Sequence, residues 1–304
     1  MPAHLLHDPV LGWYDVHARD LPWRDPGCSP WGVLVSEVML QQTPVSRVLP
    51  AWRAWLDRWP RPASLAEDSP GEAIRLWGRL GYPRRAVRLH ETSRAVVERH
   101  AGEVPSDHAA LLALPGVGAY TAAAVASFAF GQRHAVVDTN VRRVLARAVT
   151  GDEYPAPSLT AVESRLAASL LPDDAPVAAR WAVAVMELGA LVCTARSPRC
   201  ETCPLLDQCR WRLDGAPAHT GPPRRGQTYA GTDRYVRGLI LAALRAATSP
   251  LPHEAIVAAA PDTLLRDPGQ RDRCLDGLVA DGLVEPLAQG DYCLPRRTAA
   301  TLTE

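Results

Sequence analysis

The stretch CTARSPRCETCPLLDQC, residues 193–209, carries four of the seven cysteines of this 304-residue chain. The spacing is C-x6-C-x2-C-x5-C, with no histidine among the cysteines. Four thiolates at this density suit a structural zinc ion or a 4Fe–4S cluster better than four free cysteines gathered by chance. Structural zinc usually takes two C-x2-C pairs, and only one such pair is present. The spacing therefore predicts a loop that holds one 4Fe–4S cluster through Cys193, Cys200, Cys203 and Cys209.

The charge composition gives no overall sign of a nucleic-acid binder. The chain has 33 basic and 33 acidic residues, so a DNA-binding surface must gather its positive charge locally. All the basic residues are arginine, and without lysine no side chain can form a lysine Schiff base. The N-terminus lacks a signal-peptide pattern, so we expect a cytoplasmic protein whose cysteines bind metal instead of forming disulfides. We further expect a protein of bacterial type that is associated with the nucleoid.

Helical apolar spacing dominates the chain up to about residue 212 and predicts an all-α body. The uncharged stretch 109–132 is long enough to cross a membrane, but Pro115 and two glycines interrupt it, which predicts two buried helices joined by a turn. The other helices are expected at Leu65–Leu80, Arg84–His100 and Val141–Ala148.

A Pro- and Gly-rich segment, 215–228, is predicted to be a linker. Beyond it, residues 229–304 show three helical segments and then two short extended pieces around Gly290. This order predicts a small C-terminal winged-helix-like α+β module.

The turn between the two helices of the 109–132 stretch is a candidate phosphate site. Its glycines let the backbone turn tightly, and the next helix begins with N–H groups that have no partner within the helix. We expect Pro115, Gly116, Val117 and Gly118 to contact DNA phosphates, which positions a duplex without reading its sequence. Taken alone, the motif is equally compatible with an ordinary helix–helix turn.

Two carboxylates occupy contrasting settings. Glu37 is the one ionisable residue of the apolar segment 31–43, which predicts a raised pKa and a proton donor near neutral pH. Asp138 directly precedes the helical segment Thr139–Ala148. This is an N-cap position, which favours the ionised form of the carboxyl group. A protonated and an ionised carboxyl together suit cleavage of a glycosidic bond. The alternatives are a buried structural Glu37 paired with an arginine and a plain capping Asp138.

Taken together, LPGVGAYTA (114–122), VVDTNVRRVLAR (136–147), SEVMLQQT (36–43) and the cysteine loop resemble the helix-hairpin-helix DNA glycosylases with an iron–sulfur cluster, of the endonuclease III-like superfamily. SEVMLQQT, with LPWR (21–24) and RLGY (79–82), resembles specifically the MutY-type adenine DNA glycosylases. The resemblance covers about residues 10–212. It implies a six-helix barrel domain at 28–137 and an iron–sulfur cluster domain at 1–27 with 138–214. A linker at 215–228 and a C-terminal module at 229–304 would follow.

The resemblance also implies roles for single residues. Glu37 would protonate adenine at N7, and Asp138 would stabilise or trap the sugar cation with support from Asn140 and Tyr120. Lyases of this superfamily carry a lysine where Tyr120 stands, so the resemblance implies a monofunctional glycosylase without a lysine-dependent lyase step.

Five further residues would bind the substrate. Gln42 and Tyr82 would wedge into the duplex where adenine is flipped out, and Trp23, Arg24 and Leu40 would line the base pocket. Wedge residues offset the cost of flipping by filling the gap in the stack.

The expected function is base-excision repair of adenine mispaired with 8-oxoguanine or guanine in double-stranded DNA. A thymine or uracil glycosylase acting on G:T or G:U mismatches is the rival enzyme, and a non-catalytic iron–sulfur DNA-binding module is the alternative of another class. Val183, where relatives often carry Gln or Glu, and a tail unlike the usual Nudix-like domain depart from the pattern. A monomer is expected, with a sliding clamp as a candidate partner.

Overall fold

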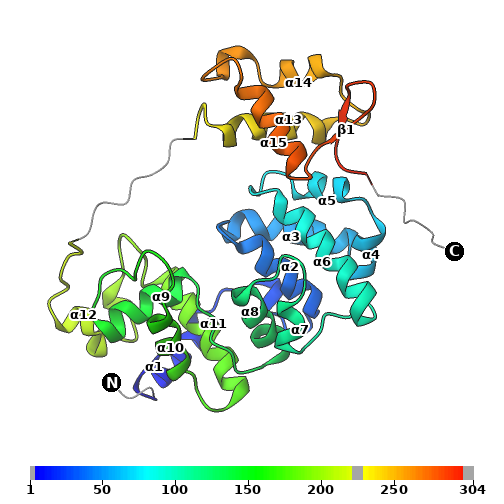
Figure 1. Cartoon of the computed structure of the whole chain (residues 1–304). Helices are drawn as coiled ribbons and strands as arrows, with labels where there is room; N and C mark the ends of the chain where they lie inside the picture. The colour runs from blue at the N-terminus through cyan, green and yellow to red at the C-terminus, as the bar shows by residue number, and fades with distance from the viewer. Residues whose placement is uncertain (1–3, 221–228, 297–304) are drawn as a thin grey trace. The chain divides into compact units, whose positions relative to one another are not determined.

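The computed structural model describes residues 4–220 and 229–296. Over these residues the chain is mostly helical, which confirms the predicted all-α body (Figure 1). The predicted linker, 215–228, lies mainly outside the described residues.

The chain forms two compact units. The first consists of residues 1–37, 105–113 and 117–223, and the second consists of residues 38–104, 114–116 and 224–304. The domain boundaries expected from the sequence follow a different division and stay a prediction. Helix α2 (Pro30–Leu40) leads from the first unit into the second.

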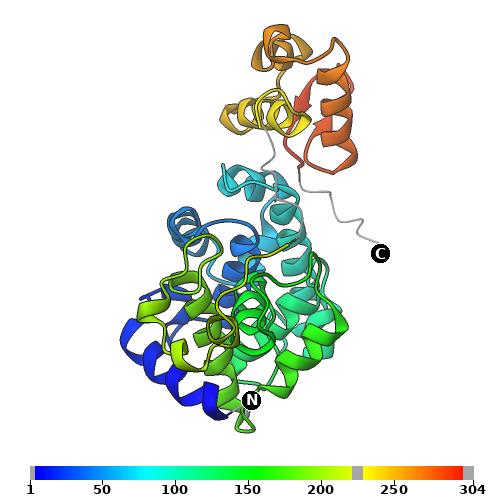
Figure 2. The same ribbon diagram turned by 90° about the vertical axis from the view of Figure 1, so that its left-hand side faces the viewer.

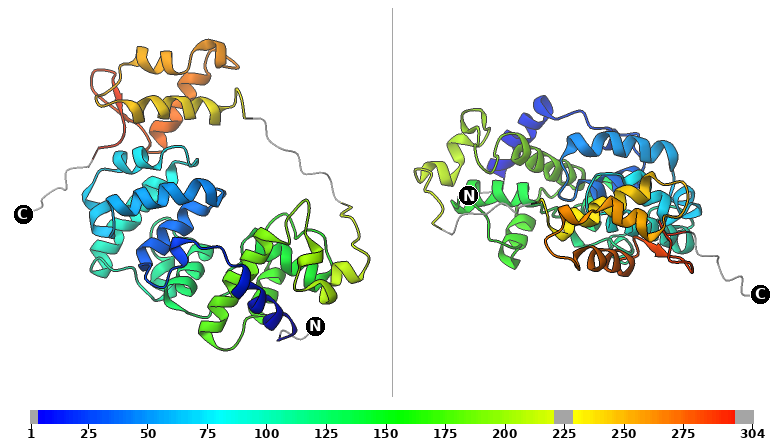
Figure 3. Two further views of the ribbon diagram at one scale, coloured as in Figure 1. Left: turned by 180° about the vertical axis from the view of Figure 1, so that it is seen from behind. Right: turned by 90° about the horizontal axis from the view of Figure 1, so that it is seen from above.

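The first unit is built from short and medium helices. They are α1 (His4–His17), η1 (Pro22–Arg24), α7 (His108–Leu112), α8 (Ala119–Phe130), α9 (Thr139–Leu145), the π-helical turn η2 (Ala146–Thr150), α10 (Ala161–Ser169), α11 (Ala175–Leu191), η3 (Cys200–Thr202), η4 (Leu206–Gln208) and α12 (Arg210–Leu213). Asp138, Thr160 and Asp174 each accept a backbone hydrogen bond at the start of α9, α10 and α11. Helix α1 lies beside α11, although the two are far apart in the sequence (Figure 3), and their apolar faces share a core with α9.

The second unit begins with α3 (Val45–Arg58), α4 (Pro62–Glu67), α5 (Pro70–Trp77) and α6 (Arg84–His100). The prediction of a single helix over Leu65–Leu80 is wrong, because the helix is interrupted between the end of α4 and the start of α5. The Ser69 hydroxyl accepts a hydrogen bond from the Glu72 N–H at 3.2 Å, and Pro70 takes the first helical position. A proline fits there but cannot continue a preceding helix.

The C-terminal segment of the second unit has the expected order of elements. Helices α13 (Asp233–Ala246), α14 (His253–Ala259) and α15 (Gln270–Ala280), with the turn η5 (Asp262–Leu264), precede an antiparallel pair of strands, β1 (Glu285–Pro286) and β2 (Tyr292–Cys293) (Figures 1 and 2). Gly290 has a φ of 83°, as expected for the turn between them. The winged-helix assignment stays a prediction.

No helix in the described parts of the chain is long and apolar enough to cross a membrane. The uncharged 109–132 stretch forms two helices, α7 and α8, separated by the predicted turn.

Three buried tryptophans pack against one another in the second unit. Trp55 meets Trp59 and Trp77 edge to face, with ring centroids 4.7 and 5.7 Å apart, and all three are buried. Trp55→Ala is expected to lower the free energy of unfolding by about 3–5 kcal/mol, because it leaves a cavity in a close-packed cluster. Denaturant unfolding followed by circular dichroism measures this. Leu112→Ala, at an exposed position, serves as the control and should change the stability little.

Candidate functional site

Glu37 lies in the third turn of α2, as its apolar surroundings in the sequence predict. Its side chain is buried, with 5% of its surface exposed, and the Tyr120 hydroxyl donates a hydrogen bond to Glu37 Oε2 at 3.0 Å. Tyr120 comes from the first turn of α8, so the turn after Gly118 brings it to the carboxyl group.

The protonation of Glu37 follows from this burial. Loss of hydration raises its pKa to about 7, the Tyr120 hydrogen bond acts in the lowering direction, and the nearby charge of Asp138 raises the pKa. Burial and the same two carboxyl groups raise the pKa of Tyr120 well above its usual range, so its phenol stays a donor. Near neutral pH, Glu37 can therefore both hold and release a proton.

Asp138 is the N-cap of α9, as predicted, and its carboxyl group accepts more hydrogen bonds than that of Glu37. Its Oδ1 accepts a hydrogen bond from the Val141 N–H at 2.7 Å, and its Oδ2 accepts one from Asn140 Nδ2 at 2.8 Å. Burial keeps the pKa of Asp138 above its usual value, although these hydrogen bonds and the charge of Arg143 act in the lowering direction. Glu37 accepts one hydrogen bond from a neutral hydroxyl, so Asp138 is the better stabilised of the two as an anion.

A chain of hydrogen bonds runs from Asp138 to the cysteine loop. The Asn140 side chain donates to Asp138, and Arg143 Nη2 donates to Asn140 Oδ1 at 2.8 Å and to the Gly189 carbonyl at 2.6 Å. Arg143 Nε donates to the Cys193 carbonyl at 2.7 Å. The position of Asn140, and through it of Asp138, therefore depends on the fold of the loop.

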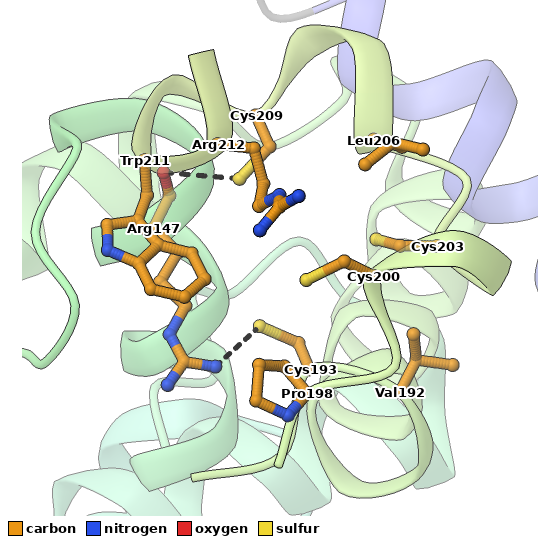
Figure 4. A pocket seen from close by; sticks show the side chains of 10 residues that line it. All are labelled: Arg147, Val192, Cys193, Pro198, Cys200, Cys203, Leu206, Cys209, Trp211 and Arg212. Carbon is orange, nitrogen blue, oxygen red and sulfur yellow. Dashed lines mark hydrogen bonds between the residues drawn. The ribbon is translucent and has the colours of Figure 1, made fainter. Parts of the chain in front are cut away.

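The four cysteines of the loop surround one hollow. Their sulfur atoms point into it, and the wall also contains Arg147, Arg212 and the apolar side chains of Val192, Pro198, Leu206 and Trp211 (Figure 4). Burial raises the pKa of the Cys203 thiol to about 11, so an isolated thiolate is unfavourable there without a bound cation. In the described parts of the chain, no three His, Cys, Asp or Glu side chains converge closely enough to hold a single metal ion. Four cysteine sulfur donors without a histidine are a ligand set that fits a 4Fe–4S cluster.

Arg147 braces the cysteine loop from the π-helical turn after α9. Its side chain is buried, and its guanidinium donates to the carbonyls of Thr194 and Ala195 at 2.8 and 3.1 Å. Arg147 Nη1 also lies 3.5 Å from Cys193 Sγ (Figure 4). A buried arginine beside the cysteines places positive charge next to a site that four thiolate ligands would make negative.

Trp23 and Arg24 form the turn η1 in the first unit. Trp23 is buried, and Arg24 Nη2 donates to Glu187 Oε2 at 2.7 Å. Arg19 makes a two-pronged contact with the same carboxylate, at 2.7 and 2.6 Å. Burial alone raises the pKa of Glu187, but the two arginines lower it to about 2. Arg24, expected in the base pocket, is thus anchored by a buried carboxylate on α11.

Leu40, Gln42 and Tyr82 belong to the second unit. Leu40 ends α2 and is half-buried, whereas Gln42 and Tyr82 are exposed. Both exposed residues have left-handed backbone, with φ values of 55° and 48°. Non-glycine residues in this region cost of the order of 1–3 kcal/mol and gather at functional sites.

The predicted phosphate turn is exposed at its glycines and buried at Val117. Gly116 has a φ of 75°, and a Cβ there would lie 2.8 Å from Arg88 Cβ, so this glycine serves a close internal approach. Gly118, the N-cap of α8, has open space around it, which leaves room for an external group. Phosphate binding by the turn stays a prediction.

Sequence reasoning missed three arginines and one glutamate that organise these sites: Arg19, Arg143, Arg147 and Glu187. Each is a charged residue within a helix or loop, and its partners lie far along the chain, so spacing gave no signal. For Glu187, the apolar run around it in α11 could have indicated burial.

The raised pKa of Glu37 makes stability depend on pH. The folded state binds the Glu37 proton more tightly than the unfolded chain does, so this residue destabilises the fold progressively as pH rises from 4.5 to 7. Glu37→Gln should therefore raise the free energy of unfolding by about 3 kcal/mol at pH 8 and change it little at pH 4.5. Denaturant titrations at both pH values measure this, and an equal effect at both would contradict the buried carboxyl.

The cysteine loop gives a second test. The protein purified anaerobically should be brown and contain about four iron atoms per chain, and Cys203→Ser should lose most of both. Cys28→Ser, outside the loop, is the control and should retain the iron. Stoichiometric zinc without iron would contradict the cluster.

Comparisons with known proteins agree with this geometry. The model of the HhH-GPD superfamily base excision DNA repair proteins matches residues 35–167, and that of the iron–sulfur binding domain of endonuclease III matches residues 193–209. The adenine DNA glycosylase of Mycobacterium tuberculosis (strain H37Rv) is 52% identical over 295 residues, covering 97% of this chain and 95% of that protein. The adenine DNA glycosylase of Mycolicibacterium smegmatis is 54% identical over 286 residues, covering 94% of each.

A solved structure of a thermostable thymine-DNA glycosylase superposes with a TM-score of 0.63 at 28% identity, covering 70% of this chain and 97% of that one. The helix-hairpin-helix glycosylase fold and the 4Fe–4S cofactor expected from the sequence are thereby confirmed. The long match to the mycobacterial proteins decides between the two glycosylase types. The chain belongs to the adenine DNA glycosylase family of base-excision repair enzymes.

Proposed function

We propose that this protein hydrolyses the N-glycosidic bond of adenine mispaired with 8-oxoguanine or guanine in double-stranded DNA. The observation that carries the proposal is the pair of carboxyl groups, the buried Glu37 with a pKa near 7 and the half-buried Asp138, which accepts two N–H hydrogen bonds. A proton donor and an anion are what departure of a purine from deoxyribose requires. Membership of the adenine DNA glycosylase family supports adenine as the base that is released.

Glu37 donates its proton to the ring nitrogen N7 of the flipped adenine. Protonation makes the base a neutral leaving group, so the glycosidic bond breaks with its electron pair on the base and leaves a positively charged sugar. The Tyr120 hydroxyl then donates to the carboxylate that remains on Glu37, at the hydrogen bond already present.

Asp138 stabilises the sugar cation until water adds to it, and the Glu37 carboxylate takes up the proton that the water releases, which restores its acid form. The Val141 N–H and the Asn140 side chain keep the Asp138 carboxylate from rotating, since each donates to one of its oxygen atoms, and Arg143 in turn holds Asn140. When bound, the cluster supplies a rigid crosslink of the cysteine loop, to which Arg143 is tied. Because the chain has no lysine, strand cleavage through a lysine Schiff base does not follow.

Substrate contacts complete the proposal. Trp23, Arg24 and Leu40 line the base pocket, and Gln42 and Tyr82 fill the gap that the flipped adenine leaves. The Pro115–Gly118 turn grips phosphates. The proposed enzyme is a monomer that acts on bacterial nucleoid DNA, and a sliding clamp is its proposed partner.

A panel of duplexes tests the substrate. With A:8-oxoguanine, A:G, G:T and G:U pairs, the protein should release adenine from the first two and no pyrimidine from the others. Release of thymine or uracil but never adenine would overturn the proposal in favour of the G-mismatch enzyme.

Glu37→Gln tests the mechanism. It should lower the single-turnover rate of adenine release by at least about a hundredfold while leaving duplex affinity nearly unchanged. The wild-type rate should fall as pH rises through about 7, where Glu37 loses its proton. Glu98→Gln, an exposed change that also removes one negative charge, is the control and should retain the rate. An unchanged rate in Glu37→Gln would remove the acid assignment.

A further inference from the structure

Arg85, in the first turn of α6, is a buried cation held by neutral acceptors. It is 7% exposed, and among the ion pairs of the described residues none joins it to a carboxylate. Burial lowers its pKa to about 10, so it remains charged at neutral pH. A buried charge without a counterion is unfavourable unless its N–H groups find acceptors. The acceptors of the Arg85 side chain fall into two groups.

The first group of bonds closes the end of α2. Arg85 Nη1 donates to the carbonyls of Val38 and Met39 at 2.8 and 3.1 Å, which belong to the last turn of that helix. It also donates to the Gln41 carbonyl at 2.7 Å, directly before Gln42. A cation at the carboxyl end of a helix satisfies free carbonyls and interacts favourably with the helix dipole.

The second group of bonds fastens the turn that carries Tyr82. Arg85 Nη2 donates to the Gly81 carbonyl at 3.0 Å, and the Arg85 backbone N–H donates to the Tyr82 carbonyl at 3.0 Å. The guanidinium carbon also lies 5.4 Å from the centroid of the Tyr82 ring. Thr43 connects the two groups, because its hydroxyl accepts from Arg85 Nη2 at 3.1 Å and is 3.3 Å from the Leu80 carbonyl.

One guanidinium thus ties together two turns separated by about forty residues. The residue exposed at each turn, Gln42 or Tyr82, has the left-handed backbone described above. Such conformations persist only where surrounding contacts impose them. In both turns, the carbonyl of the residue directly before the left-handed one accepts from Arg85.

We propose that Arg85 is a positioning residue that fixes Gln42 and Tyr82 as a preformed wedge and thereby promotes extrusion of the adenine. The inference rests on the proposed function, because it takes these two residues as the wedge. Its free-energy contribution is made before chemistry, when the base leaves the stack, and does not pass through the Glu37 proton.

The test compares Arg85→Met with the wild type on two substrates under single-turnover conditions. One is the A:8-oxoguanine duplex, and the other carries adenine opposite an abasic site, where no pairing has to be broken. The variant should lose at least about tenfold on the paired substrate and no more than about threefold on the unpaired one. Arg85→Lys, which keeps the charge with fewer donors, should fall between the two proteins on the paired substrate.

A direct reading of flipping uses 2-aminopurine in place of the adenine and the Glu37→Gln background, which does not release the base. Fluorescence should rise on binding with Arg85 present and rise much less with Arg85→Met. This reading does not need base release, so it separates the failure of the wedge from failure of the proposed function. If no protein released adenine but the fluorescence difference persisted, the function would be wrong and the role of Arg85 would stand.

The control is Arg94→Met, which removes the same charge from the same helix at an exposed residue paired with Glu98. It should match the wild type in every assay. Equal losses for Arg85→Met on both substrates, with unchanged 2-aminopurine fluorescence, would show a merely structural residue and overturn the proposal. The pH dependence of the rate should keep its midpoint, because Glu37 is untouched.

Discussion

The candidate chemistry depends on one constraint, the burial of the Glu37 carboxyl on an apolar helix. Withdrawal from water makes the charged form costly and brings its pKa into the physiological range, where a carboxyl can act as a proton donor. The surroundings must then keep that group neutral without neutralising Asp138 as well. Burial and the charge of Asp138 raise the pKa of Glu37 against the single hydrogen bond from Tyr120, whereas two N–H groups donate to Asp138 and act to lower its pKa.

Arginine holds much of this arrangement together. Arg143 connects the support of Asp138 to the Cys193 carbonyl, and Arg147 secures the same loop from the next turn. Arg85 plays the corresponding part in the second unit, at the end of α2. A planar guanidinium with five N–H donors can join several carbonyls at once, which a lysine ammonium cannot do with the same geometry. In a chain without lysine, the segments that carry the candidate site residues are therefore joined by buried arginines.

The two strained backbone positions near Arg85 agree with this role of buried arginines. Gln42 and Tyr82 hold unfavourable backbone conformations while exposed to solvent, so neither gains stability from burial of its own side chain. Their conformations are imposed by contacts from behind. A surface organised in this way is rigid before it meets a partner, which lowers the free energy needed to order it on binding.

Features encoded in short stretches of the chain could be predicted from the sequence. They are the spacing of the four cysteines, the glycine-containing turn, the apolar helix around Glu37 and the N-cap Asp138, each a short-range pattern with a direct physical meaning. Helix breaks were harder, and the one at Ser69 and Pro70 was missed because apolar spacing continues across it. Which arginines are buried, and what they bind, became visible in the folded chain alone. Arg85, Arg143 and Glu187 take partners far away in the chain, and a charged residue within a helix carries no local mark of such long-range contacts.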